Sequence, residues 1–161
     1  MRADDDISIL NGLIGATMDS ARHYRRVAGG IGNPRIRALF EHLSMQRKMI
    51  AQRLRSQLSV VSSNPLAEGV PVPAIPSARV FGDLRHALDY GYCALIDEVE
   101  RGEEHVQARY ECALKNDRLS GLSLAAVQSA YESVCEGSAK VHALKRYPHA
   151  EHSHSERLEQ W

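Results

Sequence analysis

The stretch Val99–Leu114, with the sequence VERGEEHVQARYECAL, carries one carboxylate on an otherwise apolar helical stripe. Spacings of three and four residues place side chains on one face of an α-helix. The apolar members of this face are Ile96, Val99, Val106, Tyr110 and Ala113. Glu103 falls on the same face, where we expect side chains to be buried. A buried charge is costly unless it is paired, so the other helices must supply a partner for it.

The composition indicates one globular domain. The chain has 161 residues, of which 25% are charged and 43% are hydrophobic, and these are ordinary values for such a domain. No apolar run approaches the roughly 18 residues that suggest a membrane span. The first residues, MRADDDISIL, are acidic and lack the basic and apolar regions of a secretory signal. We therefore expect a cytoplasmic protein with no membrane segment.

Three cysteines, Cys93, Cys112 and Cys135, agree with that compartment. An odd count without C-x-x-C spacing argues against a disulfide framework and against a zinc site. Free cysteines usually behave as small hydrophobic residues, so we expect these three to be half-buried on helices.

Two long helices are predicted before residue 61. The first runs from about Asp6 to Ala28 and ends at Gly29-Gly30, since glycine supplies the backbone angles of a helix C-cap. The second begins at Asn33-Pro34, an N-cap residue followed by proline at the first helical position, and runs to about Val60. Arg47 interrupts its apolar stripe. The other members of the two stripes are Leu10, Ile14, Thr17, Ala21, Tyr24 and Ala28, then Ile36, Leu39, Phe40, Leu43, Ile50, Leu54 and Val61.

A long crossover is predicted between this helical pair and a second one. Ser62 to Ala78 holds four of the six prolines and almost no periodicity, and Phe81 to Tyr90 reads as a short helix. The helix that contains the opening stretch follows and runs to about Lys115. A turn over Asn116–Gly121 leads to the last helix, from about Leu122 to Tyr147. Its expected buried members are Leu124, Val127, Tyr131, Val134, Ser138, Val141 and Leu144.

These elements predict an all-α fold, an antiparallel four-helix bundle over residues 1–148. Short turns within each helical pair, with a long crossover between the second and third long helices, are the connectivity of ferritin-like bundles. Residues 149–161, HAEHSHSERLEQW, form a polar, histidine-containing C-terminal tail that we expect to be flexible.

Six short stretches carry a resemblance to a known family: Leu10–Ile14, His23–Arg25, Asn33–Phe40, Gln46-Arg47, Glu100–Glu103 and Tyr110–Leu114. In their order and spacing the chain resembles the bacterial ferritin-like four-helix-bundle domain family of unknown function. The resemblance covers the first three long helices better than the fourth. It implies the fold and no established activity.

The resemblance raises the question of a metal centre. In di-iron ferritin-like proteins two helices each supply a carboxylate and the other two each supply Glu-x-x-His. Glu103, seven residues before Tyr110, keeps one such position, but the position seven residues after Phe40 holds Arg47, and Ile50 stands where histidine is needed. At the same level the first and last helices present Thr17, Ala21, Val134 and Ser138. A cation repels metal, so we predict a metal-free core in which Arg47 and Glu103 form a polar pair.

Other candidate ligands give weaker signals. A shifted register would bring in four residues that we expect on the surface: His23, His42, Glu104 and His105. His149, His152 and His154 in the tail could chelate a transition metal, as short histidine-rich tracts do, although a solvated tail is the simpler expectation. No spacing matches a nucleophile elbow or a phosphate-binding loop. We therefore predict no catalytic residue and no cofactor-binding residue.

The formal net charge is zero, but the two halves of the chain differ in sign. Ser20–Gln57 holds nine Arg and Lys against one acid, while Asp83–Glu111 holds eight acids against three arginines. A two-fold dimer would set the basic helical pair of one copy against the acidic pair of the other, so we predict a homodimer that weakens as salt rises. The expected outward charges are Arg22, Arg25, Arg26, Arg35, Arg37, Lys48, Arg53 and Arg55, then Asp89, Asp97, Glu98, Glu100, Glu104 and Glu111.

The sequence favours a non-catalytic protein that works by association, with itself or with an unidentified protein partner. The alternative is a di-iron oxidoreductase or an iron-handling protein, which the number of core carboxylates and the iron content would distinguish. A third reading is nucleic-acid binding through the basic first helical pair, since Lys and Arg clusters drive salt-dependent phosphate contacts. We expect association between proteins rather than nucleic-acid binding or enzymatic activity.

Overall fold

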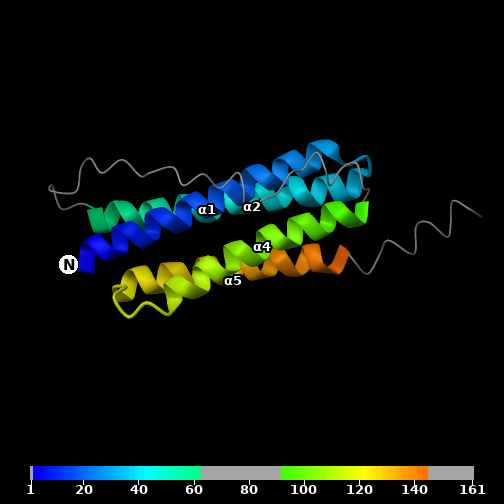
Figure 1. The fold of residues 1–161 in the computed structure, drawn as a ribbon. Helices are drawn as coiled ribbons and strands as arrows, with labels where there is room; N and C mark the ends of the chain where they lie inside the picture. The colour runs from blue at the N-terminus through cyan, green and yellow to red at the C-terminus, as the bar shows by residue number, and fades with distance from the viewer. Residues whose placement is uncertain (1, 63–91, 145–161) are drawn as a thin grey trace, which may run out of the picture.

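The computed structural model describes residues 2–62 and 92–144, which form four α-helices and their connections (Figure 1). These helices are α1 (Arg2–Gly30), α2 (Pro34–Ser62), α4 (Tyr92–Leu114) and α5 (Gly121–Leu144). The described part contains no strand, so the all-α class is confirmed. No helix in these ranges is long and apolar enough to cross a membrane.

Several predicted features lie outside the described residues. These are residues 63–78 of the expected crossover, the expected short helix over 81–90, and the tail over 149–161 with His149, His152 and His154.

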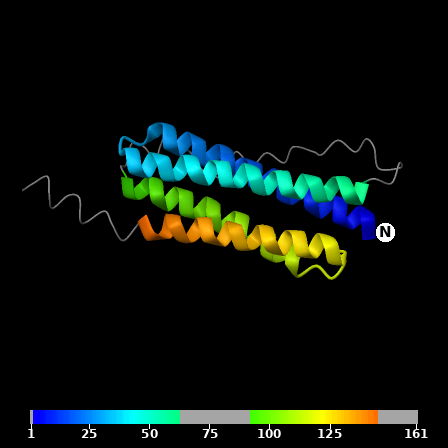
Figure 2. The same ribbon diagram turned by 180° about the vertical axis from the view of Figure 1, so that it is seen from behind.

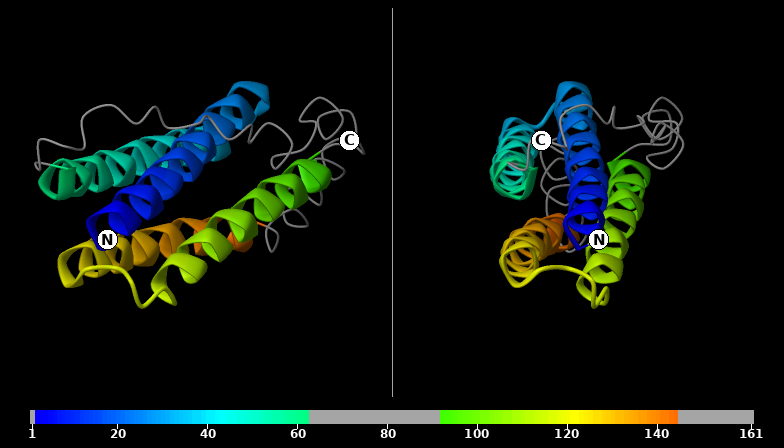
Figure 3. Two further views of the ribbon diagram at one scale, coloured as in Figure 1. Left: turned by 60° about the vertical axis from the view of Figure 1, so that its left-hand side comes forward. Right: turned by 90° about the vertical axis from the view of Figure 1, so that its left-hand side faces the viewer.

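The four helices pack as two antiparallel hairpins. The first hairpin is α1 with α2, and the second is α4 with α5. The end-on view in Figure 3 places α1 beside both α2 and α4, and α5 beside both α4 and α2. Seen from behind in Figure 2, α2 and α5 lie nearest the viewer. The described helices therefore form one bundle, with α2 and α4 on a diagonal.

The boundary between α1 and α2 is closed by local hydrogen bonds. The side-chain oxygen of Asn33 accepts from the backbone N–H of Arg35 at 3.0 Å and of Ile36 at 3.4 Å, which is the action of a helix N-cap. The predicted start of α2 at Pro34 is confirmed. Arg37 donates from Nε and Nη2 to the carbonyl of Ile31 at 3.1 and 2.7 Å, so its side chain ties the connection between the helices to the start of α2.

The apolar core has two clusters, one on each side of a polar layer. The first includes Leu10, Leu13, Ile14, Ile50, Leu54, Val106, Tyr110, Val127 and Val134. The second includes Tyr24, Val27, Phe40, Leu43, Ile96, Val99 and Val141. Every predicted stripe member on α1 and α4 is buried. Predicted members on the edges of α2 and α5 are only half-buried: Ile36, Leu39, Val61, Leu124, Tyr131, Ser138 and Leu144.

Asp6 caps a helix other than its own. Its carboxylate accepts from the backbone N–H of Ser120 at 3.0 Å, from the Ser120 hydroxyl at 2.5 Å and from the Ser123 hydroxyl at 2.8 Å. Asp6 is buried, and Ser120 immediately precedes α5, so this one carboxylate fixes the start of α5 to α1. Burial raises the pKa of Asp6, but the hydrogen bonds from Ser120 and Ser123 outweigh it and hold the pKa below the ordinary 3.8.

We expect Asp6→Ala to lower the free energy of unfolding by about 1–3 kcal/mol, because the buried donor of Ser123 and the half-buried donors of Ser120 lose their acceptor. The folded pKa lies below the ordinary value, so the contribution of Asp6 is present above pH 3.8 and is lost as the pH falls below it. Urea unfolding at neutral and acid pH measures both effects. Asp4→Ala, at an exposed position of the same helix end, is the matched control. An Asp6→Ala protein with wild-type stability would contradict this role.

Candidate functional site at the centre of the bundle

Arg47 and Glu103 meet in the polar layer between the two apolar clusters. Arg47 on α2 is fully buried and Glu103 on α4 is 4% exposed. Nη2 of Arg47 donates to Oε2 of Glu103, and also to the backbone carbonyl of Val134 at 3.3 Å. The structure thus brings together the lone charges of two predicted stripes, across the diagonal of the bundle (Figure 3).

The remaining two helices complete the hydrogen bonding of Glu103. Ser20 on α1 donates to Oε1 at 3.2 Å, and Ser138 on α5 donates to Oε2 at 2.6 Å. Each helix therefore contributes one polar side chain to the layer. Because a buried charge-assisted pair is favourable only when its remaining lone pairs are satisfied, the two serines support the contact between Glu103 and Arg47.

Two buried tyrosines enclose the pair without adding charge. The guanidinium carbon of Arg47 lies 5.7 Å from the ring centroid of Tyr24, a cation–π distance. Burial raises the pKa of Tyr24 well above its ordinary value, and the Glu103 carboxylate raises it further. Burial also raises the pKa of Tyr110. Both phenols therefore stay neutral at physiological pH.

Tyr110 is held by a directed chain of hydrogen bonds. The single hydroxyl proton of Thr17 goes to the carbonyl of Leu13 at 2.7 Å. The contact of 2.6 Å between the Thr17 and Tyr110 oxygens must then have Tyr110 as the donor. Thr17 lies at the level where a di-iron protein would need a metal ligand, and its hydroxyl is already engaged by Leu13 and Tyr110.

Arg47 is less completely satisfied than Glu103. Its Nε and Nη1 find no hydrogen-bond acceptor among the residues that the structure describes. Buried donors without an acceptor cost free energy. We therefore expect that replacing both Arg47 and Glu103 with well-packed apolar side chains lowers stability less than removing one of them does.

Gly137 makes room for the guanidinium on α5. A Cβ at this position would lie 3.1 Å from Oε1 of Gln46, 3.2 Å from Nη2 of Arg47 and 3.3 Å from Cδ2 of Leu43. Any larger residue must push Arg47 or Gln46 away from α5. The sequence signal for this role was a glycine in a helix interior, which often marks close packing, but we did not predict it.

The donor set does not fit a di-iron centre. The layer holds one carboxylate, whose oxygens already accept from Arg47, Ser20 and Ser138. Two iron ions need several bridging and terminal carboxylates together with imidazole. Within residues 2–62 and 92–144, no three His, Cys, Asp or Glu side chains gather in a way that could hold a metal ion.

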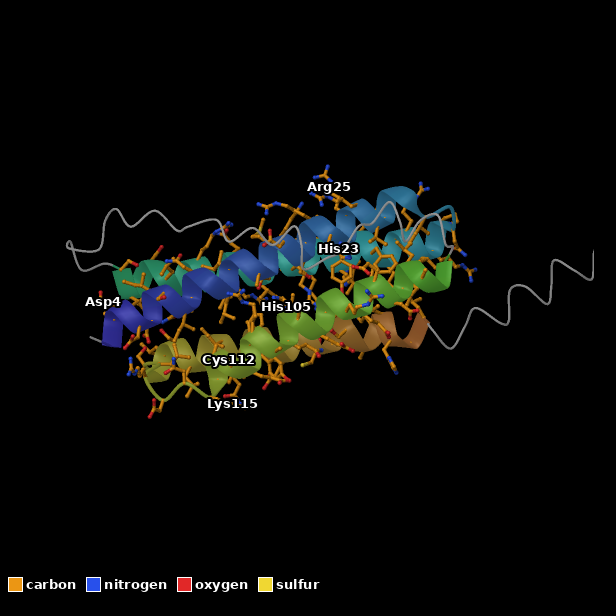
Figure 4. The ribbon with its side chains drawn as sticks, viewed as in Figure 1. Asp4, His23, Arg25, His105, Cys112 and Lys115 are labelled. Atoms are coloured by element: carbon orange, nitrogen blue, oxygen red, sulfur yellow. The ribbon has the colours of Figure 1, made fainter. Side chains whose placement is uncertain are left out.

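The alternative ligands are spread over the bundle. His42, Glu104 and His105 are exposed, as expected. The surface prediction was wrong for His23, which is 4% exposed because it lies on the flank of α1 that also buries Ser20 and Val27. Burial and the nearby charge of Arg26 lower the pKa of His23 to about 4, so it is neutral at physiological pH. Figure 4 shows His23 on α1 and His105 on α4.

The cysteines only partly match their expected exposure. Cys135 is half-buried and free, whereas Cys112 is free but exposed, because α4 turns it away from the core stripe. The side chain of Cys93 lies outside the described part of the structure.

We expect Glu103→Ala to lower the free energy of unfolding by roughly 3–5 kcal/mol, because it leaves the Arg47 charge buried without its partner. The double change Arg47→Met with Glu103→Leu should cost much less, since no charge is left behind. Chemical denaturation compares the two. Glu104→Ala, at an exposed neighbour, is the control and should change stability by no more than about 0.5 kcal/mol. Equally mild single and double changes would show that the pair is not buried in solution.

A pair of glycine variants tests the space beside Arg47. Gly15→Ala, in the interior of α1 with nothing within 4 Å of the added Cβ, should stabilise the protein by about 1 kcal/mol. Gly137→Ala gains the same helix propensity but crowds Arg47 and Gln46, and overpacking costs about 1–3 kcal/mol. We expect a net loss of stability in thermal or urea unfolding. Equal stabilisation by both alanines would show that the contact at Gly137 relaxes freely.

Comparison with known proteins reveals one family. The family described as a domain of unknown function (DUF2383) matches residues 5–116. The match includes Arg47 and Glu103 and ends before α5, which supplies Val134, Gly137 and Ser138 to the layer. A search of curated proteins finds no match. Since the matched residues make up well over half of the 161-residue chain, the protein belongs to this family of domains of unknown function.

Proposed function

We propose that this protein is a ferritin-like bundle that works by association, in the first place with a second copy of itself, and that its core holds no metal centre. The ferritin-like part is supported by chain direction. Figure 1 places the end of α2 and the start of α4 at opposite ends of the bundle. The connection between them has to join those two ends, as in bundles with one crossover.

The filled polar layer supports a role outside the core. Arg47 takes the place that a metal-binding carboxylate would need, and Glu103 has its oxygens engaged by three helices. Catalysis at this layer would require a substrate to reach Arg47 and Glu103, which are less than 5% exposed. The surface is therefore the better place to look for activity.

The observation that carries the proposal is that the basic charges of the first hairpin are not neutralised by the second. Seven exposed basic side chains of this hairpin form no ion pair with another residue in the described ranges: Arg25, Arg26, Arg35, Arg37, Lys48, Arg53 and Arg55. Arg22 pairs within its own helix with Asp19 at 2.8 Å. The charge asymmetry of the sequence is thus still present on the folded surface, where a partner can meet it.

The acidic side of the surface differs from the expectation. Glu98 was expected to point outward but is buried and pairs with Arg101 at 3.2 Å, and Glu100 is 17% exposed beside His142 at 2.9 Å. Asp89 lies outside the described residues. The exposed acids of the second hairpin that remain include Glu104, Glu111, Glu132 and Glu136. Acidic surface therefore extends onto α5.

A bacterial, cytoplasmic setting belongs to the same proposal. It is supported by the family resemblance and by the odd number of cysteines, which provides no disulfide framework.

Sedimentation of the full chain at several salt concentrations tests the association. We expect a dimer at micromolar protein in low salt, with a dissociation constant that rises with salt because charge pairing contributes to encounter and orientation. A monomer at every salt concentration would overturn self-association. Iron analysis of protein grown with excess iron tests the other half, and about two irons per chain would overturn the metal-free core.

A further inference from the structure

The large apolar side chains exposed in the described part of the chain all belong to two helices. They are Met45 (60% exposed), Met49 (54%) and Val60 (60%) on α2, and Leu122 (72%) on α5. None of them lies on α1 or α4, among the residues whose side chains the structure describes. Exposed apolar residues gathered on one side of a molecule mark an interaction surface more often than scattered ones do. Met49 and Val60 lie four and seven residues from Arg53, which lines a cavity between α2 and α5, so they share that side of α2. We call this side the α2–α5 face, and these two helices lie nearest the viewer in Figure 2.

The same face contains a hollow as well as protruding side chains. A cavity of about 100 Å³ opens between the two helices, lined by Ile50, Arg53, Leu54, Ala126, Ser129 and Ala130. Its α5 wall is made of small residues, which let another helix approach closely. Met49 precedes Ile50 and lies one turn from Arg53, so it stands beside the cavity on the outer side of α2.

The register of α2 against α5 places the other exposed residues at one level. Nε2 of Gln57 donates to the hydroxyl of Ser123 at 3.4 Å. Val60 and Leu122 are close in sequence to these two residues, so both lie at the same end of the α2–α5 face. Arg53 and Ser129 line the same cavity, and Glu132 lies three residues beyond Ser129, about 4.5 Å along the helix axis.

The charges beside the cavity are opposite on the two helices. On α2, Arg53 lines the cavity, while exposed Lys48 and Arg55 lie on another side of the helix. On α5, exposed Glu132 and Glu136 follow Ser129 by three and seven residues, and the exposed base Lys140 comes one turn later. A surface that is basic on one helix and acidic on the next is complementary to itself after a two-fold rotation.

We propose that the α2–α5 face is the surface through which two copies of this chain associate. This inference rests on the proposed self-association and names its site. A two-fold axis parallel to the helices, along the line between α2 and α5, sets α2 of each copy on α5 of the other and keeps every residue at its level. Val60 then meets Leu122 of the second copy, Met49 meets the small residues around the cavity, and Arg53 comes within one turn of Glu132. An axis across the helices would instead set α2 on α2 and oppose like charges.

Sedimentation of full-length variants at low salt tests the face. Met49→Lys and Leu122→Lys should each raise the dimer dissociation constant roughly tenfold or more, because each places a charge in an apolar contact of the interface. Ala108→Lys, at an exposed position on α4 away from the face, is the control and should leave it unchanged. Thermal unfolding of each variant verifies that the monomer still folds.

A charge reversal makes the test specific to the proposed pairing. Arg53→Glu and Glu132→Lys should each weaken the dimer, and the double variant should recover most of the loss. If the wild-type protein is a dimer and all four single variants (at Met49, Leu122, Arg53 and Glu132) dimerise with the same affinity, the α2–α5 face is overturned. Self-association would then still stand. A wild-type monomer would overturn self-association itself. Loss of the dimer in the Ala108→Lys control as well would also count against this face.

Discussion

The bundle depends on a charge that it buries. Arg47 has no exposed surface, and an unpaired guanidinium in that position would cost several kcal/mol. Glu103 removes most of that cost, but only where α2 and α4 stand at the right height and rotation across the diagonal of the bundle. The requirement extends to the other helices, because Ser20 from α1 and Ser138 from α5 must reach the same carboxylate. One ion pair thus constrains the relative level of all four helices.

The layer acts on register more than on stability. Apolar residues of similar volume often stabilise a core as well as a buried ion pair does, and here two donors of Arg47 find no acceptor among the described residues. The apolar clusters on either side hold the helices together but do not distinguish a shift of one turn, since Leu, Ile and Val recur at every turn. A shifted helix would separate Arg47 from Glu103 or bring Gly137 out from behind the guanidinium. The polar layer penalises such alternatives, while Asp6 fixes the start of α5 at the far end.

What could be predicted from the sequence was decided by periodicity. Arg47 and Glu103 were identifiable because each interrupts an apolar stripe with spacing of three and four, and the same pattern located the four helices. The exposure of residues on the flanks of the helices was harder to predict from the sequence. His23 and Glu98 are buried because the neighbouring helix covers the edge of the stripe, and the width of that cover depends on packing angles that no single helix encodes.

Contacts between residues far apart in the sequence were the other feature that could not be predicted. Asp6 could be placed at the N-terminus of its own helix, but its action on Ser120 requires the bundle to close first. The role of Gly137 likewise exists only opposite Gln46 and Arg47. Ser138 was located on the buried stripe of α5, yet its donation to Glu103 follows from the level of α5 relative to α4, which the turn and the Asp6 cap determine together.

The helix α2 departs from the usual amphipathic pattern on both sides, and each departure has its own cause. A helix packed on a single core is normally apolar inward and charged outward. Here Arg47 is buried while Met45, Met49 and Val60 are exposed. The inner departure is explained by Glu103. The outer one has no explanation among the described residues of one copy, because exposing three apolar side chains on one helix is unfavourable in water. A helix that contacts its own core on one side and a second copy on the other would need the composition that α2 has.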